Sequence, residues 1–260
     1  MNELEELTKS VGIDWTKVNI IEDAGSTLRV KFGISPDQYL EFAYQDFESN
    51  DIHGYVNAIS NAKRSSECQL DGFFACIGYT TWNEKFLPQN EKDYINKHSD
   101  AVKKKIPAKL KLLNALDVAP LILITKMRSL RNNVEHQYEI PNRNETVEAL
   151  EIAQYFNAMI QNVLKGFCEQ FFIENDFEPK RKLRFAFDAE KHHFDIYGFV
   201  EGKDIGNIRV LKGQYNYLEL IKLNIAIAKE RKRNVNEALY ELLQSINCKI
   251  PRNKVEVNLK

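Results

Sequence analysis

Cysteine is scarce and scattered in this chain, which argues against two kinds of cysteine framework. The 260 residues include 4 cysteines, and no two of them form a Cys-x-x-Cys pair. Structural zinc sites and disulfide-rich secreted domains need closely spaced or numerous cysteines. We therefore predict that these cysteines are small buried apolar side chains in a reducing cytosol. They are Cys68, Cys76, Cys168 and Cys248.

The chain also lacks a long apolar run and a leader-like beginning. The apolar stretch 118–124 is far shorter than the roughly 20 residues that a membrane-spanning helix needs. The first residues include Glu3, Glu5 and Glu6, where a signal peptide would carry basic and then apolar residues. We expect a cytoplasmic protein without a membrane partner.

Neither sign of charge is in excess, and glycine does not form a phosphate-binding loop. The net charge is −1, so any contact with nucleic acid must come from a local basic patch. No spacing of histidine and cysteine matches a metal site. The glycines of the C-terminal part lack the strand–loop–helix context of a phosphate loop, and we expect neither metal nor cofactor. These glycines are Gly198, Gly202, Gly206 and Gly213.

What the sequence does contain is a long middle region with helical periodicity. Apolar residues recur there at steps of three and four, and Ser35, Asp51 and Asn144 are suitable N-cap residues. The polar segment 80–106 predicts an irregular connection that is long for a compact bundle. The predicted helices cover 36–47, 51–77, 107–116, 119–136 and the stretch from 144 to about 171.

Segments rich in β-forming residues flank this region. Residues 17–22 and 26–32 surround an Asp-Ala-Gly turn and predict an N-terminal β-hairpin. Beyond Asp176 the apolar residues alternate with a period of two, which predicts antiparallel strands. The segment 218–229 fits either a strand or a helix, and 236–246 is an amphipathic helix. The predicted C-terminal strands cover 183–187, 194–200, 208–211 and 254–258.

The predicted fold class is α+β, in three parts. A helical bundle (36–174) is flanked by an N-terminal β-hairpin arm (1–35) and a C-terminal antiparallel α/β region (175–260). A two-stranded hairpin alone is rarely stable, so we expect 17–32 to join the C-terminal strands in one sheet.

Two features of the C-terminal region have more than one interpretation. The pair His192-His193 suggests a metal or proton-relay site, but neighbouring strand residues face opposite ways, which favours a turn or an exposed strand edge. Five aromatic residues could stack the bases of single-stranded RNA or fill the sheet core, and the frequency of core aromatics favours the core. They are Phe185, Phe187, Phe194, Tyr197 and Phe199.

The central motif is the polar run at the end of the predicted helix 119–136. Arg128, Asn132 and His136 follow one another at steps of four and share one helical stripe. Arg131 is offset from His136 by about 140° on a regular helix, which a long guanidinium can bridge. A cationic fork and an imidazole side by side are suited to handling a phosphodiester. The helix must end before Pro141.

The apolar face of this helix is separate from the motif. Leu123, Met127, Leu130 and Val134 recur at three- and four-residue steps and predict the core-facing side. The motif residues therefore project from the opposite side. A purely structural interpretation remains open, in which Arg131 only makes hydrogen bonds within the bundle.

The order Arg131, four residues, His136, one residue, Tyr138 resembles the Arg-x4-His-x-Tyr signature of the HEPN superfamily. The pattern of helices over residues 36–174 also resembles that superfamily, whereas the first 35 and last 85 or so residues do not. The resemblance implies a HEPN-like helical bundle. It also implies a metal-independent endoribonuclease, of the kind found in toxin–antitoxin and phage-defence systems.

The resemblance also implies roles for the motif residues. His136 would be the general base or acid, and Arg131 would bind the phosphate oxygens. Asn132 would orient the histidine or the phosphate. Arg128 would help to bind substrate, and Glu135 would do so or hold the Arg131 guanidinium in place.

The partners implied by the resemblance are RNA, a second copy of the chain, and an antitoxin or other regulatory protein. In HEPN toxins paired with a minimal nucleotidyltransferase antitoxin the signature tyrosine can be adenylylated, which would make Tyr138 a modification site. The structural alternative is that Tyr138 packs its ring at the helix end and is never modified. The alternative function is an inactive HEPN scaffold that binds nucleic acid or a partner protein. Intact Arg131, Asn132 and His136 favour the nuclease.

Overall fold

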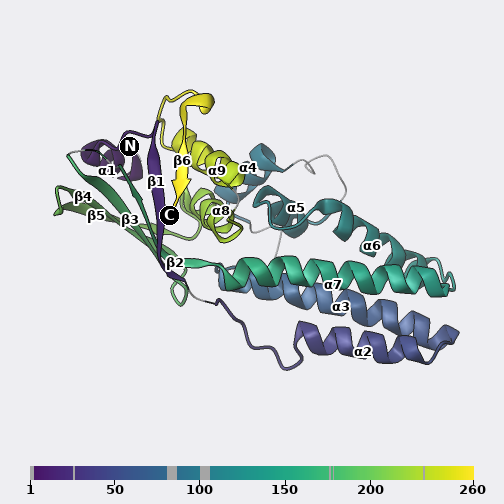
Figure 1. Cartoon of the computed structure of the whole chain (residues 1–260). Coiled ribbons are helices and arrows are strands. Elements are labelled where there is room, and N and C mark those ends of the chain that lie inside the picture. The colour runs from purple at the N-terminus through teal and green to yellow at the C-terminus, as the bar shows by residue number, and fades with distance from the viewer. Residues whose placement is uncertain are drawn as a thin grey trace. The chain divides into compact units, whose positions relative to one another are not determined.

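The computed structural model describes residues 3–25, 27–80, 87–99, 106–175, 177, 179–230 and 232–260. Within these ranges the side chains of Leu121, Ile124 and Met127 are not described. The chain forms two compact units (Figure 1). Unit 1 contains residues 1–28, 86–94 and 165–260, and unit 2 contains residues 29–85 and 95–164.

Unit 1 is built on a six-stranded sheet with the order β5-β4-β3-β2-β1-β6. β1 pairs with β6 in parallel, and all other neighbours are antiparallel. The α+β class is therefore confirmed, with a mixed sheet in place of a purely antiparallel one. The strands are β1 (Val18–Gly25), β2 (Cys168–Glu174), β3 (Arg181–Asp188), β4 (His193–Val200), β5 (Lys203–Leu211) and β6 (Val257–Leu259).

The predicted N-terminal hairpin is wrong. Residues 18–25 form one strand, and residues 27–32 form none. β1 finds its partners far away in the sequence, in β2 and β6. The chain thus leaves the sheet after β1, builds the helices of unit 2, and returns to the sheet at β2.

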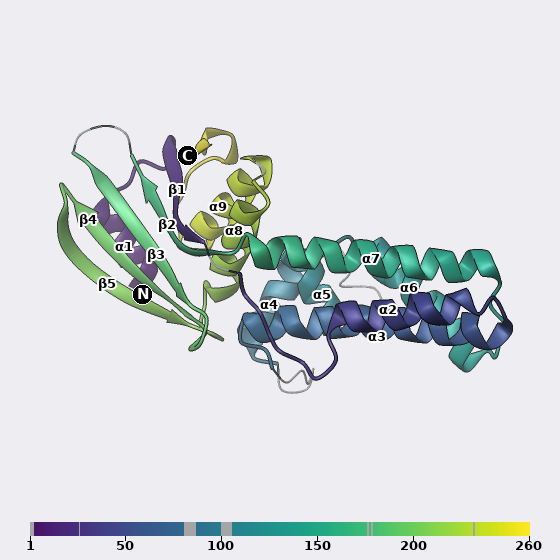
Figure 2. The same ribbon diagram turned by 60° about the horizontal axis from the view of Figure 1, so that its bottom comes forward.

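Helices α1 (Glu3–Val11), α8 (Tyr217–Ala228) and α9 (Lys232–Ser245) cover one face of this sheet (Figure 2). A Cβ on Gly198 of β4 would lie 2.7 Å from Val11 and 2.9 Å from Leu7, so α1 packs directly on the strand. The ring of Tyr217 in α8 meets that of Phe194 on the same face, with centroids 6.1 Å apart. The ambiguous segment 218–229 thus falls almost entirely in the helix α8. Its side chains are buried on nearly all sides of the helix, which is why the sequence shows no clear helical period.

Unit 2 is a helical bundle of α2 (Pro36–Glu48), α3 (Ile52–Cys76), α5 (Ala108–Ala115), α6 (Leu121–His136) and α7 (Arg143–Lys165). Figure 2 shows α2, α3 and α7 running side by side. Small side chains at their contacts, Ala43, Ala62 and Ala153, allow the helices to approach closely. Leu123 and Leu130 of α6 pack against the same core. The side chain of Met127, predicted on this face, lies outside the described residues.

The predicted helix starts are mostly right. The Ser35 hydroxyl accepts from the backbone of Gln38 in a capping box, and Asp51 accepts from Gly54. The start of α7 differs, because Asn142 and Glu145 exchange hydrogen bonds of 3.0 and 2.9 Å between side chain and backbone. Asn142, two residues before the predicted Asn144, is therefore the capping residue, and α7 begins at Arg143.

Two further boundaries differ from the prediction. α7 ends at Lys165, and β2 begins three residues later at Cys168, where the helix was predicted to continue. Gly166 permits this turn, because a Cβ there would lie 3.0 Å from the carbonyl oxygen of Ala228. The segment predicted as an irregular connection contains α4 (Gln89–His98), while 81–86 and 100–105 lie outside the described residues.

The cysteines are free, and two of them are buried as predicted. Burial raises the pKa of the Cys76 thiol to about 11. Burial, together with the nearby Glu22, raises the pKa of Cys168 to about 12. Both thiols therefore stay protonated and unreactive at neutral pH. Cys68 and Cys248 are only half-buried, and Cys168 lies in a strand where a helix was predicted.

Candidate functional site

The motif occupies the last two turns of α6. Arg131 Nη1 lies 3.0 Å from His136 Nε2, so the guanidinium bridges the offset between the two positions as predicted. Because Nη1 is a donor, this contact requires the His136 tautomer in which Nε2 is the acceptor. The histidine is exposed. An acceptor nitrogen on an exposed imidazole, held beside a cation, is a suitable general base.

Two neighbours hold the Arg131 guanidinium. Its Nη2 forms an ion pair with Glu135, and its Nη1 donates to Asn132 Oδ1 at 3.1 Å. Glu135 therefore makes the predicted contact that holds the Arg131 guanidinium in place. Asn132 contacts the arginine, not the histidine. Arg131 Nε is buried and has no hydrogen-bond partner among the described residues.

The predicted stripe of Arg128, Asn132 and His136 divides into two parts. Arg128 and Asn132, together with Arg131, line a cavity of about 430 Å³ between α3, α5, α6 and α7. His136 does not line this cavity. Arg131 thus contributes to both places: it lines the cavity, and its guanidinium contacts His136 at the exposed helix end.

Two lysines that the sequence analysis did not associate with the motif also line this cavity. Lys63 comes from α3 and pairs with Glu67 at 3.1 Å, and Lys109 comes from α5 and pairs with Asp71. Burial lowers the pKa of Lys109, while the charge of Glu67 opposes this shift. No local spacing connects these lysines to α6, so only the folded bundle reveals them.

The end of α6 places Tyr138 in solvent. The backbone N–H groups of Gln137 and Glu139 both donate to the Asn133 carbonyl, at 3.2 and 3.1 Å. Tyr138 between them has a φ of 56°, a left-handed conformation uncommon for a bulky residue. Its side chain is 86% exposed. The tyrosine therefore does not pack as an anchor against the described residues.

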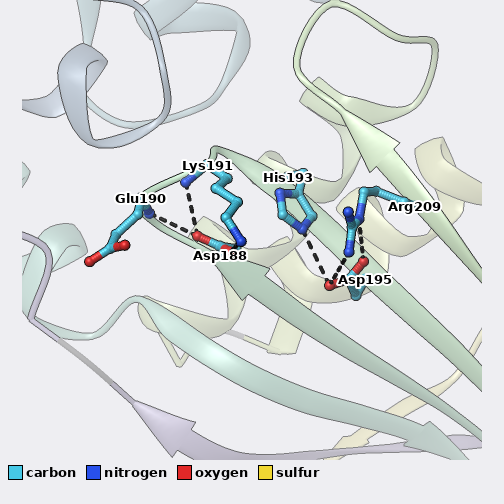
Figure 3. A network of polar contacts seen from close by, with 6 residues as sticks. All are labelled: Asp188, Glu190, Lys191, His193, Asp195 and Arg209. Carbon is cyan, nitrogen blue, oxygen red and sulfur yellow. Dashed lines mark hydrogen bonds and ion pairs between the residues drawn. The ribbon is translucent and has the colours of Figure 1, made fainter.

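A second polar cluster lies in unit 1, at the β3–β4 turn (Figure 3). Asp195 receives two hydrogen bonds from Arg209, at 2.7 and 3.2 Å, and contacts His193 at 3.2 Å. The Arg209 guanidinium, with a smaller effect from His193, lowers the pKa of Asp195. Asp188 accepts from the backbone of Glu190 and Lys191 and so closes the turn.

The hydrogen bonds of this cluster have a structural role, because they join β4 to β5 and close the β3–β4 turn. The expectation of an exposed strand edge is wrong for His193, which is 2% exposed at the start of β4. His192 sits in the turn with a φ of 55°. No group of three or more His, Cys, Asp or Glu within the described ranges is arranged to hold a metal ion.

Comparisons with known proteins are silent on this chain: no family model, curated protein or solved structure matches it. Among the helices that the structure describes, none has the length and apolar character needed to cross a bilayer.

Proposed function

We propose that the chain is a HEPN-type, metal-independent endoribonuclease whose bundle is unit 2 and whose site is the end of α6. The observation that supports this most is the 3.0 Å contact between Arg131 and the exposed His136. Glu135 and Asn132 hold the guanidinium in place beside the histidine, which supports a preorganised site.

In the proposed reaction His136 Nε2 removes the proton of an RNA 2′-hydroxyl, and the 2′-oxygen attacks the adjacent phosphorus. The bond to the 5′-oxygen then breaks, leaving a cyclic phosphate and a 5′-hydroxyl. Arg131 neutralises charge that accumulates on the non-bridging oxygens. Arg128 and Asn132, on the cavity side, would hold the flanking part of the substrate.

A homodimer is part of this proposal. The departing 5′-oxygen needs a proton, and a single motif supplies one histidine. A second copy of α6 across a two-fold axis would supply the other. Light scattering at micromolar concentration should therefore give a dimer.

The test is cleavage of a fluorescent RNA by the purified full chain in EDTA. His136→Ala should abolish cleavage. The matched control is His53→Ala, at an exposed position of α3, and this variant should cleave RNA at the parent rate. Products should carry cyclic phosphate and 5′-hydroxyl ends. Parent-rate cleavage by His136→Ala would refute the assignment. An inactive parent that still binds RNA would favour the scaffold.

The proposal includes a toxin or phage-defence role in which modification of Tyr138 switches the nuclease off. The exposed Tyr138 hydroxyl lies two residues from His136, so a nucleotide attached to it would crowd the site and add negative charge. An antitoxin encoded elsewhere would add it. Intact-mass measurement of protein from its native cells should show the added mass, and Tyr138→Phe should remain unmodified and active.

A further inference from the structure

The face of the sheet opposite α1, α8 and α9 is covered by none of the helices described in unit 1, and it carries an ordered set of side chains. Phe172, Arg184 and Tyr197 are paired neighbours on β2, β3 and β4, and therefore point to the same side. In the next row Lys182 of β3 pairs with Phe199 of β4. All five side chains are partly exposed. Phe185 and Phe194, by contrast, face the helices and are buried.

Cations and rings alternate across this face. The middle strand β3 supplies Lys182 and Arg184, and the rings come from the strands on either side. Lys182 Nζ lies 3.3 Å from the centre of the Phe172 ring, and the Arg184 guanidinium lies 5.7 Å from the centre of Tyr197. Arg184 Nη2 donates to Gln170 Oε1 at 2.5 Å, which holds the guanidinium on this face, and its Nε is buried without a hydrogen-bond partner among the described residues.

The face is also hollowed at this place. A depression of about 670 Å³ is lined by Phe172, Phe199, Lys182 and Arg184, with further side chains around them. Four of the charged lining residues are cations and two are carboxylates, Asp23 and Glu174. The hollow is thus locally cationic although the chain carries a net charge of −1.

We propose that this face of unit 1 binds single-stranded nucleic acid, with phosphates along β3 and bases on the rings of β2 and β4. Every base has a flat face that stacks on an aromatic ring, and lysine or arginine neutralises the backbone. Tyr197 and Phe199 are two residues apart on one strand, which separates them by about 6.6 Å. That is wider than the ~3.4 Å rise of duplex DNA, so the platform fits an extended single strand.

This inference is independent of the proposed nuclease, because none of its residues belongs to the motif on α6. An acidic peptide would use the cations but has no need of three rings beside them. A duplex keeps its bases stacked inside and would leave the rings unused.

The test is fluorescence anisotropy of a labelled 12-nucleotide deoxythymidine strand with the full chain at ~0.1 M salt. A DNA strand has no 2′-hydroxyl, so the proposed cleavage does not interfere. Tyr197→Ala and Phe199→Ala should each weaken binding at least about fivefold. Arg184→Gln should weaken binding and flatten its dependence on salt.

Two matched controls should bind like the parent: Tyr155→Ala, an exposed aromatic on α7, and Lys203→Gln, an exposed cation on β5. Thermal melts should show that the ring variants fold. The proposal is overturned if the parent does not bind the single strand, or if the ring variants bind like the parent. Competition by polyglutamate or by duplex DNA as strong as by the unlabelled strand would also overturn it.

Discussion

Asn224 provides the sharpest test of how unit 1 holds its sheet. Its side-chain Oδ1 accepts from the Cys168 backbone N–H at 2.9 Å, and its Nδ2 donates to the Cys168 carbonyl at 2.7 Å. Both residues are fully buried. The side-chain amide of Asn224 on α8 thus makes the two backbone hydrogen bonds that a neighbouring strand would make with the first residue of β2.

Replacing Asn224 by leucine should destabilise unit 1 strongly. The change leaves two buried backbone groups without partners, at a cost of about 1–3 kcal/mol each. Burying the leucine side chain returns ~1–2 kcal/mol. We expect a net loss of ~2–4 kcal/mol, a large part of the 5–15 kcal/mol that is typical of a whole domain.

The assay is urea unfolding followed by tryptophan emission. Trp15 is buried in unit 1, and a Trp82→Phe background leaves it as the single reporter. The matched control is Asn207→Leu, the same substitution at an exposed position of β5. A difference between the two variants below ~0.5 kcal/mol would refute the reasoning.

Asn224→Asp adds a pH-dependent check. A buried carboxylate keeps the acceptor but loses the donor, and burial raises its pKa above the unfolded value. Its destabilisation should therefore be greatest at neutral pH and should decrease as the pH falls through the folded-state pKa, because the protonated acid can donate again. A variant whose stability relative to the parent did not change with pH would contradict this account.

Three more predictions concern other contacts. Ser65→Ala should destabilise unit 2 by ~1–3 kcal/mol in urea unfolding, because the buried Asn157 amide loses its 2.6 Å acceptor. Gly198→Ala should lower the melting temperature of unit 1, because its Cβ would lie 2.7 Å from a methyl group of α1. Arg209 lowers the pKa of Asp195, so this contact stabilises the fold above the unfolded pKa and is lost as the pH falls. Asp195→Asn should therefore lose less stability than the parent on acidification, as measured by thermal melts from pH 6 to 3.

The local features of this protein could be predicted from its sequence. The helices of unit 2 follow from apolar periodicity and from caps such as Ser35 and Asp51, whose bonds span only three residues. The Arg131–His136 contact also depends on one helix and the length of one side chain. Such features need no knowledge of the rest of the fold.

The failures of prediction that change the topology involve partners distant in the sequence. A turn-like Asp-Ala-Gly sequence suggested a hairpin, but the partners of β1 lie about 150 and 240 residues further along the chain. Phe171 continued the helical apolar pattern of α7, yet Gly166 ends that helix and the residue belongs to β2. Periodicity alone does not distinguish a short buried strand from the end of a buried helix.

The sequence by itself determined most helices of unit 2, most of the C-terminal strands and the polar end of α6, because these depend on neighbouring residues. Only the tertiary structure decided that 218–229 is a helix, since burial on all sides removes the periodic signal. It also placed Lys63 and Lys109 beside Arg131, and separated Tyr197 and Phe199 from the core aromatics. Which face of a strand is covered depends on where distant helices pack, and no local pattern carries that information.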